Sequence, residues 1–119
     1  MKAIIVDDEQ LVCENLEIKL HQIPQITGIT MFINPYDALD HAEQNPVDIA
    51  FLDIEMPEVG GIEMAKRLTS INPAMKIIFV TGHSKYEIDA SGMEAYGYLA
   101  KPVTVENVRD VLEDGVSRG

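Results

Sequence analysis

Short apolar runs alternate along the chain with longer amphipathic stretches. Five runs are mostly continuous rather than alternating, and they cover residues 3–6, 29–33, 49–52, 77–80 and 98–100. Continuous apolar runs suit strands that are buried on both faces, as they are in a parallel sheet. The pattern therefore predicts five strands of one parallel sheet.

The stretches between these runs carry apolar residues at helical spacing. The first pattern ends at Pro24, and the second opens with Asn34-Pro35, an N-cap residue followed by proline at the first helical position. The third covers about residues 62–71, a fourth and weaker one about 85–93, and the fifth begins after Pro102 with Thr104 as its cap. The predicted apolar stripes are Val12, Leu16, Leu20 and Ile23 in the first pattern, Ile62, Ala65, Leu68 and Ile71 in the third, and Val105, Val108, Val111 and Leu112 in the fifth.

Strands that alternate with helices favour an α/β fold with five helices on both faces of a single five-stranded parallel sheet. The length of 119 residues suits one domain that buries its own core. We assign residues 1–116 to this domain and interpret 117–119 as the start of a linker.

Composition narrows the function further. The net charge of −11 argues against direct nucleic-acid binding by this domain, because phosphate contacts need Lys and Arg patches. A single cysteine, Cys13, excludes an internal disulfide and fits a reducing compartment. No apolar run approaches the ~20 residues that span a membrane, and the acidic start is unlike a secretory signal. We expect a cytoplasmic protein.

Complementary polar residues follow four of the predicted strands. Asp7 and Asp8 follow the first, Asp53 the third, Thr81 the fourth and Lys101 the fifth. Ligands of doubly wound sheets bind outside the carboxyl ends of the strands, so these residues are expected at one rim.

The chemistry of this set points to phosphoryl transfer. Crowded carboxylates repel one another, and a hard cation such as Mg²⁺ relieves the repulsion. A carboxylate is also a nucleophile toward phosphorus, and Mg²⁺, the Lys101 ammonium and the Thr81 hydroxyl would stabilise the charge of the transferring group.

The segments IIVDDE, FLDIEMPEVGGIE, IIFVTGH and YGYLAKP together resemble the receiver domain of two-component response regulators over essentially the whole chain. The resemblance implies a flavodoxin-like fold with strand order 2-1-3-4-5. It also implies that Asp53 is the phosphoacceptor, that Thr81 and Lys101 contact the phosphoryl group, and that the Lys101–Pro102 peptide is cis. Tyr98 is the expected switch aromatic.

The same resemblance implies a Mg²⁺ site, in which Mn²⁺ can substitute. Asp8 and Asp53 would bind the metal directly, Glu55 through its backbone carbonyl and Asp7 through water. The expected phosphodonor is a sensor histidine kinase or a phosphotransfer protein. Enzymatic activity would be limited to self-phosphorylation from the donor and self-dephosphorylation.

Phosphorylation is expected to act as a two-state switch. Thr81 would move toward the phosphoryl group, Tyr98 would rotate inward, and the surface of the fourth helix, fifth strand and fifth helix would repack for homodimerisation or for an output domain. Tyr96 and Met93 would lie near that surface. The local sequence is similar to that of receivers with a LytTR-type DNA-binding output domain. Glu94 and Gly97 depart from the commonest pattern of the family, and His83 is a candidate regulator or an ordinary loop histidine.

Three alternatives remain for the site. A flavodoxin would need a phosphate cradle where this chain has Asp7 and Asp8. A phosphohydrolase with an aspartate nucleophile would turn over external phosphoesters, and Asp53-Ile54-Glu55 only partly matches its D-x-D motif. A phosphorylation-independent receiver-fold interaction module would be expected to lack Asp53, Lys101 or the acidic pair.

Overall fold

The computed structural model describes residues 1–82 and 95–114, which contain five strands and four helices. The strands β1 (Lys2–Val6), β2 (Gly28–Phe32), β3 (Ile49–Asp53), β4 (Lys76–Thr81) and β5 (Gly97–Ala100) form one parallel sheet in the order β2-β1-β3-β4-β5. The helices are α1 (Gln10–Leu20), α2 (Pro35–Gln44), α3 (Gly61–Ile71) and α5 (Val105–Asp114). The predicted sheet and strand order are confirmed, while the helix expected at about 85–93 lies outside the described residues.

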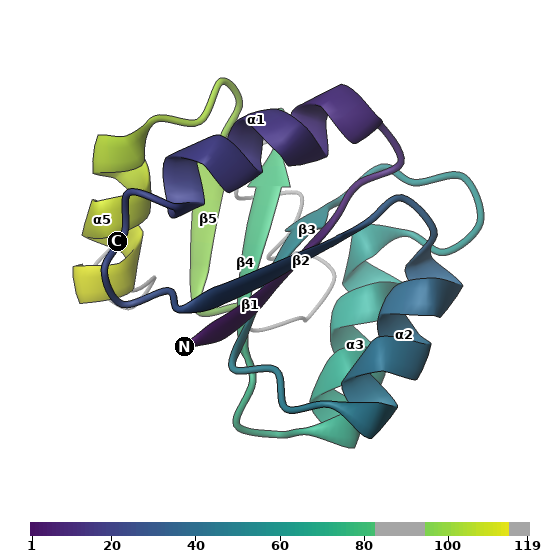
Figure 1. Ribbon diagram of the computed structural model, residues 1–119. Coiled ribbons are helices and arrows are strands. Elements are labelled where there is room, and N and C mark those ends of the chain that lie inside the picture. Colours follow the sequence, from purple (N-terminus) through teal and green to yellow (C-terminus); the bar gives the residue numbers. More distant parts are fainter. Residues whose placement is uncertain (83–94, 115–119) are drawn as a thin grey trace.

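The helices cover the two faces of the sheet in pairs. Helices α2 and α3 lie together on one face, and α1 and α5 lie on the other (Figure 1). Residues along each central strand alternate between the two cores, so that Ile4 and Val6 of β1 face α2 and α3, whereas Ile5 faces α1 and α5. Burial on both faces explains why the central strands are continuously apolar.

The predicted helix caps are present. The Asn34 side chain accepts a hydrogen bond of 2.8 Å from the backbone N–H of Tyr36, and Pro35 begins α2. The Thr104 hydroxyl accepts one of 3.1 Å from the backbone N–H of Asn107 in α5. Each cap satisfies a backbone donor that the first turn of a helix leaves without a partner.

Two details of the predicted pattern are wrong. Strand β2 lies at an edge of the sheet and is only partly buried, so its apolar run does not mark a strand covered on both faces. In α3 the predicted stripe is shifted, because Ile71 is 36% exposed while Met64 is completely buried. The helix therefore presents the face that carries Met64, Ala65 and Leu68 to the core.

The strand register aligns the polar residues that end the strands. Val6 of β1 pairs with Leu52 of β3, so the residues that follow, Asp7 and Asp53, lie side by side. Thr81, the last residue of β4, pairs with Ala100 of β5, directly before Lys101. The fold thus brings all four chain segments to one rim of the sheet.

Candidate phosphoryl-transfer site

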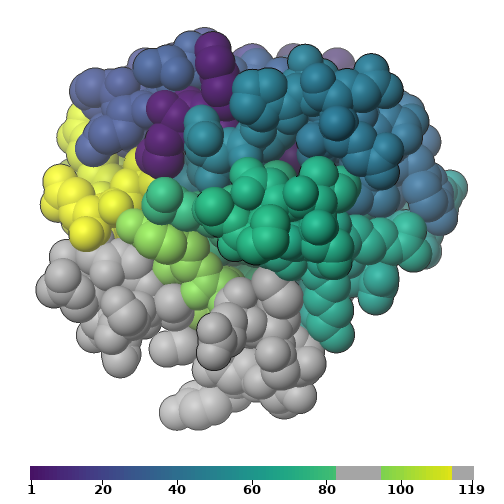
Figure 2. Space-filling view, turned by 90° about the horizontal axis from the view of Figure 1, so that it is seen from below, coloured from purple at the N-terminus to yellow at the C-terminus, as the bar shows by residue number. Residues whose placement is uncertain are grey.

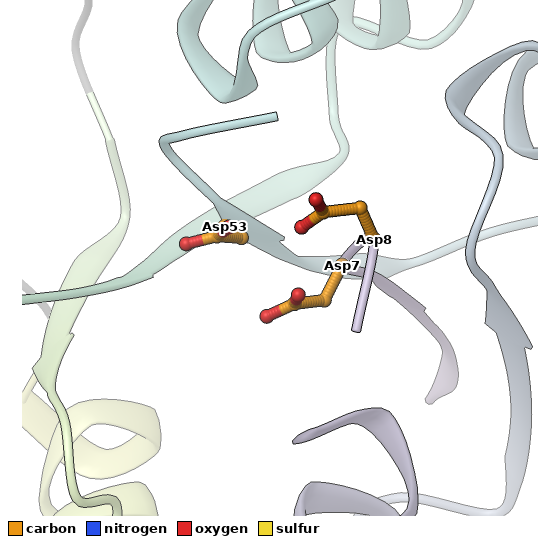
Figure 3. Close-up of side chains that lie close together, drawn as sticks. All are labelled: Asp7, Asp8 and Asp53. Atoms are coloured by element: carbon orange, nitrogen blue, oxygen red, sulfur yellow. The ribbon is translucent and has the colours of Figure 1, made fainter. Parts of the chain in front are cut away.

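Three carboxylates meet at this rim. The carboxylate oxygens of Asp7, Asp8 and Asp53 lie within 4.8 Å of one another, and Figure 3 shows the first two leaving the end of β1 and the third leaving the end of β3. Asp7 and Asp53 are buried, whereas Asp8 is exposed. This is an all-oxygen donor set of the kind that hard divalent cations prefer, so the residues present fit a Mg²⁺ site.

Within residues 1–82 and 95–114, Lys101 is the cation that contacts these carboxylates. Its Nζ lies 3.2 Å from Asp53 Oδ1 and 3.4 Å from Asp7 Oδ2. The Lys101 backbone N–H donates to the Thr81 carbonyl at 3.1 Å, which continues the pairing of β4 and β5 beyond the strands. The Lys101–Pro102 peptide is cis, as expected.

The charges at the site are not balanced by this one lysine. Burial raises the pKa of Asp7 above its usual value, and the Asp53 charge adds to the rise. Burial likewise raises the pKa of Asp53, with a contribution from Asp8, although Lys101 acts in the opposite direction. Burial would lower the pKa of Lys101, but Asp7 and Asp53 outweigh it, so that pKa is raised too. The ammonium is shared by two carboxylates and fully compensates neither.

Two neighbours that hold Asp7 in place have no role in the sequence pattern. The backbone N–H of Glu9 donates to Asp7 Oδ1 at 2.9 Å, and the Cys13 thiol donates to the Asp7 backbone oxygen at 3.4 Å. Cys13 is completely buried, and burial raises the pKa of its thiol to about 11. The sequence predicts Cys13 as a small packed residue of the first helical pattern, and its burial confirms this. Its hydrogen bond to Asp7 was not predicted, and Val12, which the predicted stripe placed toward the core, is only half-buried.

An open cavity lies over the carboxylates. Its volume is about 440 Å³, and its lining residues are Asp8, Glu9, Asp53, Glu55, Thr81, Gly82 and Lys101. Most of the predicted site residues therefore share one solvent-accessible space. Asp7 lies beneath it and does not line it, and Glu9 and Gly82 are additional lining residues.

The expected switch aromatic lies on β5, three residues before Lys101. Tyr98 is half-buried, and its ring stacks on Phe79 of β4 with centroids 6.1 Å apart. Tyr96 points to the other face, where its hydroxyl donates to the Leu112 carbonyl of α5 at 3.1 Å. In Figure 2, which shows the molecule from below, the light-green residues around β5 reach the surface beside α5 in yellow. His83, Met93 and Glu94 lie outside the described residues.

Comparison with known proteins agrees with this geometry. The family model of the response regulator receiver domain matches residues 3–113. The chain belongs to this family. The function of the receiver family is phosphorylation-based two-component signalling, and receiver domains are generally signalling modules rather than enzymes.

Relatives and solved structures are similar across the whole receiver domain. The sensory transduction protein LytT of Enterococcus faecalis is 31% identical over 95% of this chain and 47% of its own length. The sensory transduction protein LytR of Staphylococcus epidermidis is 32% identical over 94% of the chain and 44% of its length. The response regulatory domain of the Klebsiella pneumoniae protein mrkE is 28% identical, with a TM-score of 0.82 over 99% of this chain and 97% of that one.

The receiver domain spans about half the length of the curated relatives it matches. Among the residues that the structure describes, no helix has both the length and the apolar character that a bilayer crossing requires.

Proposed function

We propose that Asp53 is the phosphoacceptor of this receiver domain. The observation that carries the proposal is the position of its carboxylate, which lines the open cavity and lies 3.2 Å from Lys101 Nζ. Asp7 is a weaker candidate, because it accepts the Glu9 N–H and does not line the cavity. Asp8 is exposed, and a donor could reach it, but Lys101 contacts Asp7 and Asp53 instead.

The reaction transfers a phosphoryl group without net redox change. A carboxylate oxygen of Asp53 attacks the phosphorus of a phosphohistidine or an acyl phosphate, and the bond from phosphorus to the donor breaks as the acyl phosphate forms. A leaving imidazole then takes a proton from solvent. Lys101 keeps its proton throughout and pairs with the phosphoryl oxygens, and the Thr81 hydroxyl donates a hydrogen bond to them. Attack of water on phosphorus later releases phosphate and regenerates the Asp53 carboxylate.

Asp8, Asp53, the Glu55 backbone carbonyl and, through water, Asp7 would hold Mg²⁺ or Mn²⁺. When bound, the cation supplies positive charge to the phosphoryl oxygens and screens the carboxylates from one another. The close approach of the three carboxylates supports this assignment, as do the raised pKa values of Asp7 and Asp53.

The switch would begin at Thr81 and end at Tyr98. Thr81 is buried and lies at the end of β4, and Phe79 on the same strand stacks with Tyr98. A shift of Thr81 toward the phosphoryl group would open space for the half-buried Tyr98 ring to rotate inward. The surface beside β5 and α5 would then change for a second copy or for an output domain.

The proposed phosphodonor is a sensor histidine kinase or a phosphotransfer protein. The relatives named sensory transduction proteins are longer than this chain, which supports a C-terminal output domain of the LytTR DNA-binding type in the longer protein. The negative charge of this domain fits a role in which the output, and not the receiver, contacts DNA. Such a protein would work in the cytoplasm.

The test is intact-mass analysis after incubation with acetyl phosphate. We expect one added phosphoryl group on the wild-type domain with Mg²⁺ or Mn²⁺, and none with chelator or in Asp53→Asn. Asp40→Asn removes an equivalent charge from the exposed face of α2 and should label as the wild type does. Labelling of Asp53→Asn would show that another residue is the acceptor. A wild type that stays unlabelled at all sampling times would favour a phosphorylation-independent interaction module.

A further inference from the structure

The backbone that carries Asp53 is packed tightly against the start of α3. The loop from residue 54 to 60 closes on itself, because the Gly61 N–H donates to the Ile54 carbonyl at 2.9 Å. Met56 and Val59 of the same loop are buried in the core beneath α2 and α3. The path of the chain between Asp53 and α3 is therefore fixed from both ends.

Gly61 lies very close to the backbone of Asp53 and Ile54. A β-carbon added there would lie 2.0 Å from the Asp53 backbone oxygen, 2.8 Å from its carbonyl carbon and 2.9 Å from Ile54 Cα. All three atoms belong to backbone, so no side-chain rotation could relieve the overlap. A methyl group at this position must move the start of α3 or the Asp53 peptide by about 1 Å.

The other glycines in the described ranges 1–82 and 95–114 differ in this respect. At Gly60 the nearest atom, the Ile54 oxygen, would lie at an ordinary 3.5 Å, and at Gly82 nothing lies within 4 Å. At Gly28 and Gly97 the close neighbours are side-chain atoms of Lys2 and Val111. Among these glycines, Gly61 alone faces backbone atoms closer than 3 Å.

We infer that Gly61 is a positioning residue for phosphoryl transfer. The peptide against which it packs carries the Asp53 carboxylate, and two residues further the chain reaches Glu55, whose backbone carbonyl is assigned to the metal. Because Gly61 lacks a side chain, α3 can begin directly against this peptide and hold both groups toward Lys101 and Asp8. The inference rests on the proposed role of Asp53. It adds to the site a residue that does not line the cavity.

Gly61→Ala tests the inference, with Gly60→Ala as the matched control in the neighbouring position. Amide chemical shifts of the unphosphorylated domain measure Mg²⁺ binding. We expect Gly61→Ala to raise the Mg²⁺ concentration at half-saturation at least about 5-fold. Its maximal rate of labelling by acetyl phosphate should fall about 10- to 100-fold, the usual effect of a misplacement near 1 Å. Gly60→Ala should stay within about twofold in both measurements, because its new methyl meets only an ordinary contact.

Urea unfolding of the same variants without metal separates positioning from folding. A purely structural glycine would lower the unfolding midpoint and leave the Mg²⁺ half-saturation of the folded protein unchanged, and that result would overturn the inference. A wild-type domain that takes no label would instead contradict the role of Asp53.

Hydrogen exchange of the wild-type domain provides a second test that does not depend on the variant folding. Mg²⁺ held by Asp53 and the Glu55 carbonyl should steady the Ile54 peptide between them. Exchange of the Gly61 N–H, which is bonded to Ile54, should then slow several-fold with saturating Mg²⁺. The Met64 N–H, bonded to the Gly60 carbonyl within the helix, serves as the control. Equal exchange of the Gly61 N–H with and without Mg²⁺ would also refute the inference.

Discussion

Replacing Asp53 by asparagine should stabilise the metal-free domain, although it removes the proposed acceptor. The carboxylate oxygens of Asp53, Asp7 and Asp8 lie within 4.8 Å of one another, so at an effective dielectric constant of about 20 each repulsion costs about 3–4 kcal/mol. The attraction of Asp53 to Lys101 at 3.2 Å contributes about 5 kcal/mol on the same scale. Water screens the repulsion by the exposed Asp8, but burial also disfavours the Asp53 charge and is the largest cause of its raised pKa. The net relief on removing the Asp53 charge is therefore about 1–2 kcal/mol at pH 7.

Urea unfolding in the presence of EDTA, followed by circular dichroism, measures this difference. A gain of 1–2 kcal/mol corresponds to a rise in Tm of roughly 4–8 °C for a domain of this size. The control is again Asp40→Asn, which changes the net charge equally on an exposed helical face and should shift stability by less than about 0.5 kcal/mol. Excess Mg²⁺ should stabilise the wild type more than Asp53→Asn, because the variant lacks one of the carboxylates.

The pH dependence has a definite sign. The pKa of Asp53 is raised in the folded domain above its value of 3.8 in the unfolded chain, so folding is favoured by protonation of this carboxyl. Its contribution to stability is fully present below pH 3.8 and is lost as the pH rises through the folded pKa. The advantage of Asp53→Asn should therefore be largest at neutral pH and shrink toward pH 4. A variant that is less stable than the wild type at pH 7 without metal would refute this account of the site.

Four further predictions address Lys101 and the surrounding fold. Lys101→Met should lower the free energy of unfolding of the metal-free domain by about 1–2 kcal/mol, a value kept small because Lys101 is partly exposed to solvent. It should also slow labelling by acetyl phosphate about 100-fold. The Cys13 thiol, with its pKa raised to about 11, should react with iodoacetamide at pH 8 at least ~100-fold more slowly in the folded domain than in urea. Gly97→Ala places a methyl 2.7 Å from Val111 Cγ1 and should cost about 1–3 kcal/mol on urea unfolding without loss of labelling. Thr104→Ala removes the cap of α5 and should cost about 1 kcal/mol in the same assay.

The position of the site was predictable because it depends on topology more than on packing. Once the apolar runs are parallel strands, their carboxyl ends share one rim, and Asp7, Asp53, Thr81 and Lys101 must follow them there. The direct contacts of Lys101 with Asp7 and Asp53 then follow from charge complementarity. The metal-binding and phosphoryl-binding roles of these residues stay predictions until they are measured.

The orientation of α3 was not predictable from periodicity. Ile62, Ala65, Leu68 and Ile71 form an apolar stripe on the helix, but the stripe through Met64 overlaps it by two residues and is apolar as well. The choice between them depends on how α3 packs against α2 and the sheet, which no local pattern records. The helix settles with Met64 inside and Ile71 partly exposed.

The support of the site by backbone atoms was also hidden in the sequence. The Glu9 N–H donates a hydrogen bond to the Asp7 side chain, and the Cys13 thiol donates one to the Asp7 carbonyl. Both hydrogen bonds depend on the local path of the chain, which the identities of Glu9 and Cys13 do not reveal. The two adjacent glycines of the segment FLDIEMPEVGGIE could not show that Gly61 touches the Asp53 peptide while Gly60 does not.

The crowding of the carboxylates disfavours their charges without a cation, and it would also make the site responsive to one. A site whose charges were already balanced by the protein would gain little from a metal ion or a phosphoryl group, and a ligand shifts an equilibrium only by its differential affinity for the two states. Here Asp7 and Asp53 are buried and share the partly exposed Lys101, and burial, with a smaller contribution from neighbouring carboxylates, raises the pKa of both. A bound cation would favour their charged forms and so relieve this cost. Phosphorylation of Asp53 would then redirect Lys101 toward the phosphoryl oxygens and away from Asp7. That rearrangement starts next to Thr81, one strand away from Tyr98, which is where the surface change is expected.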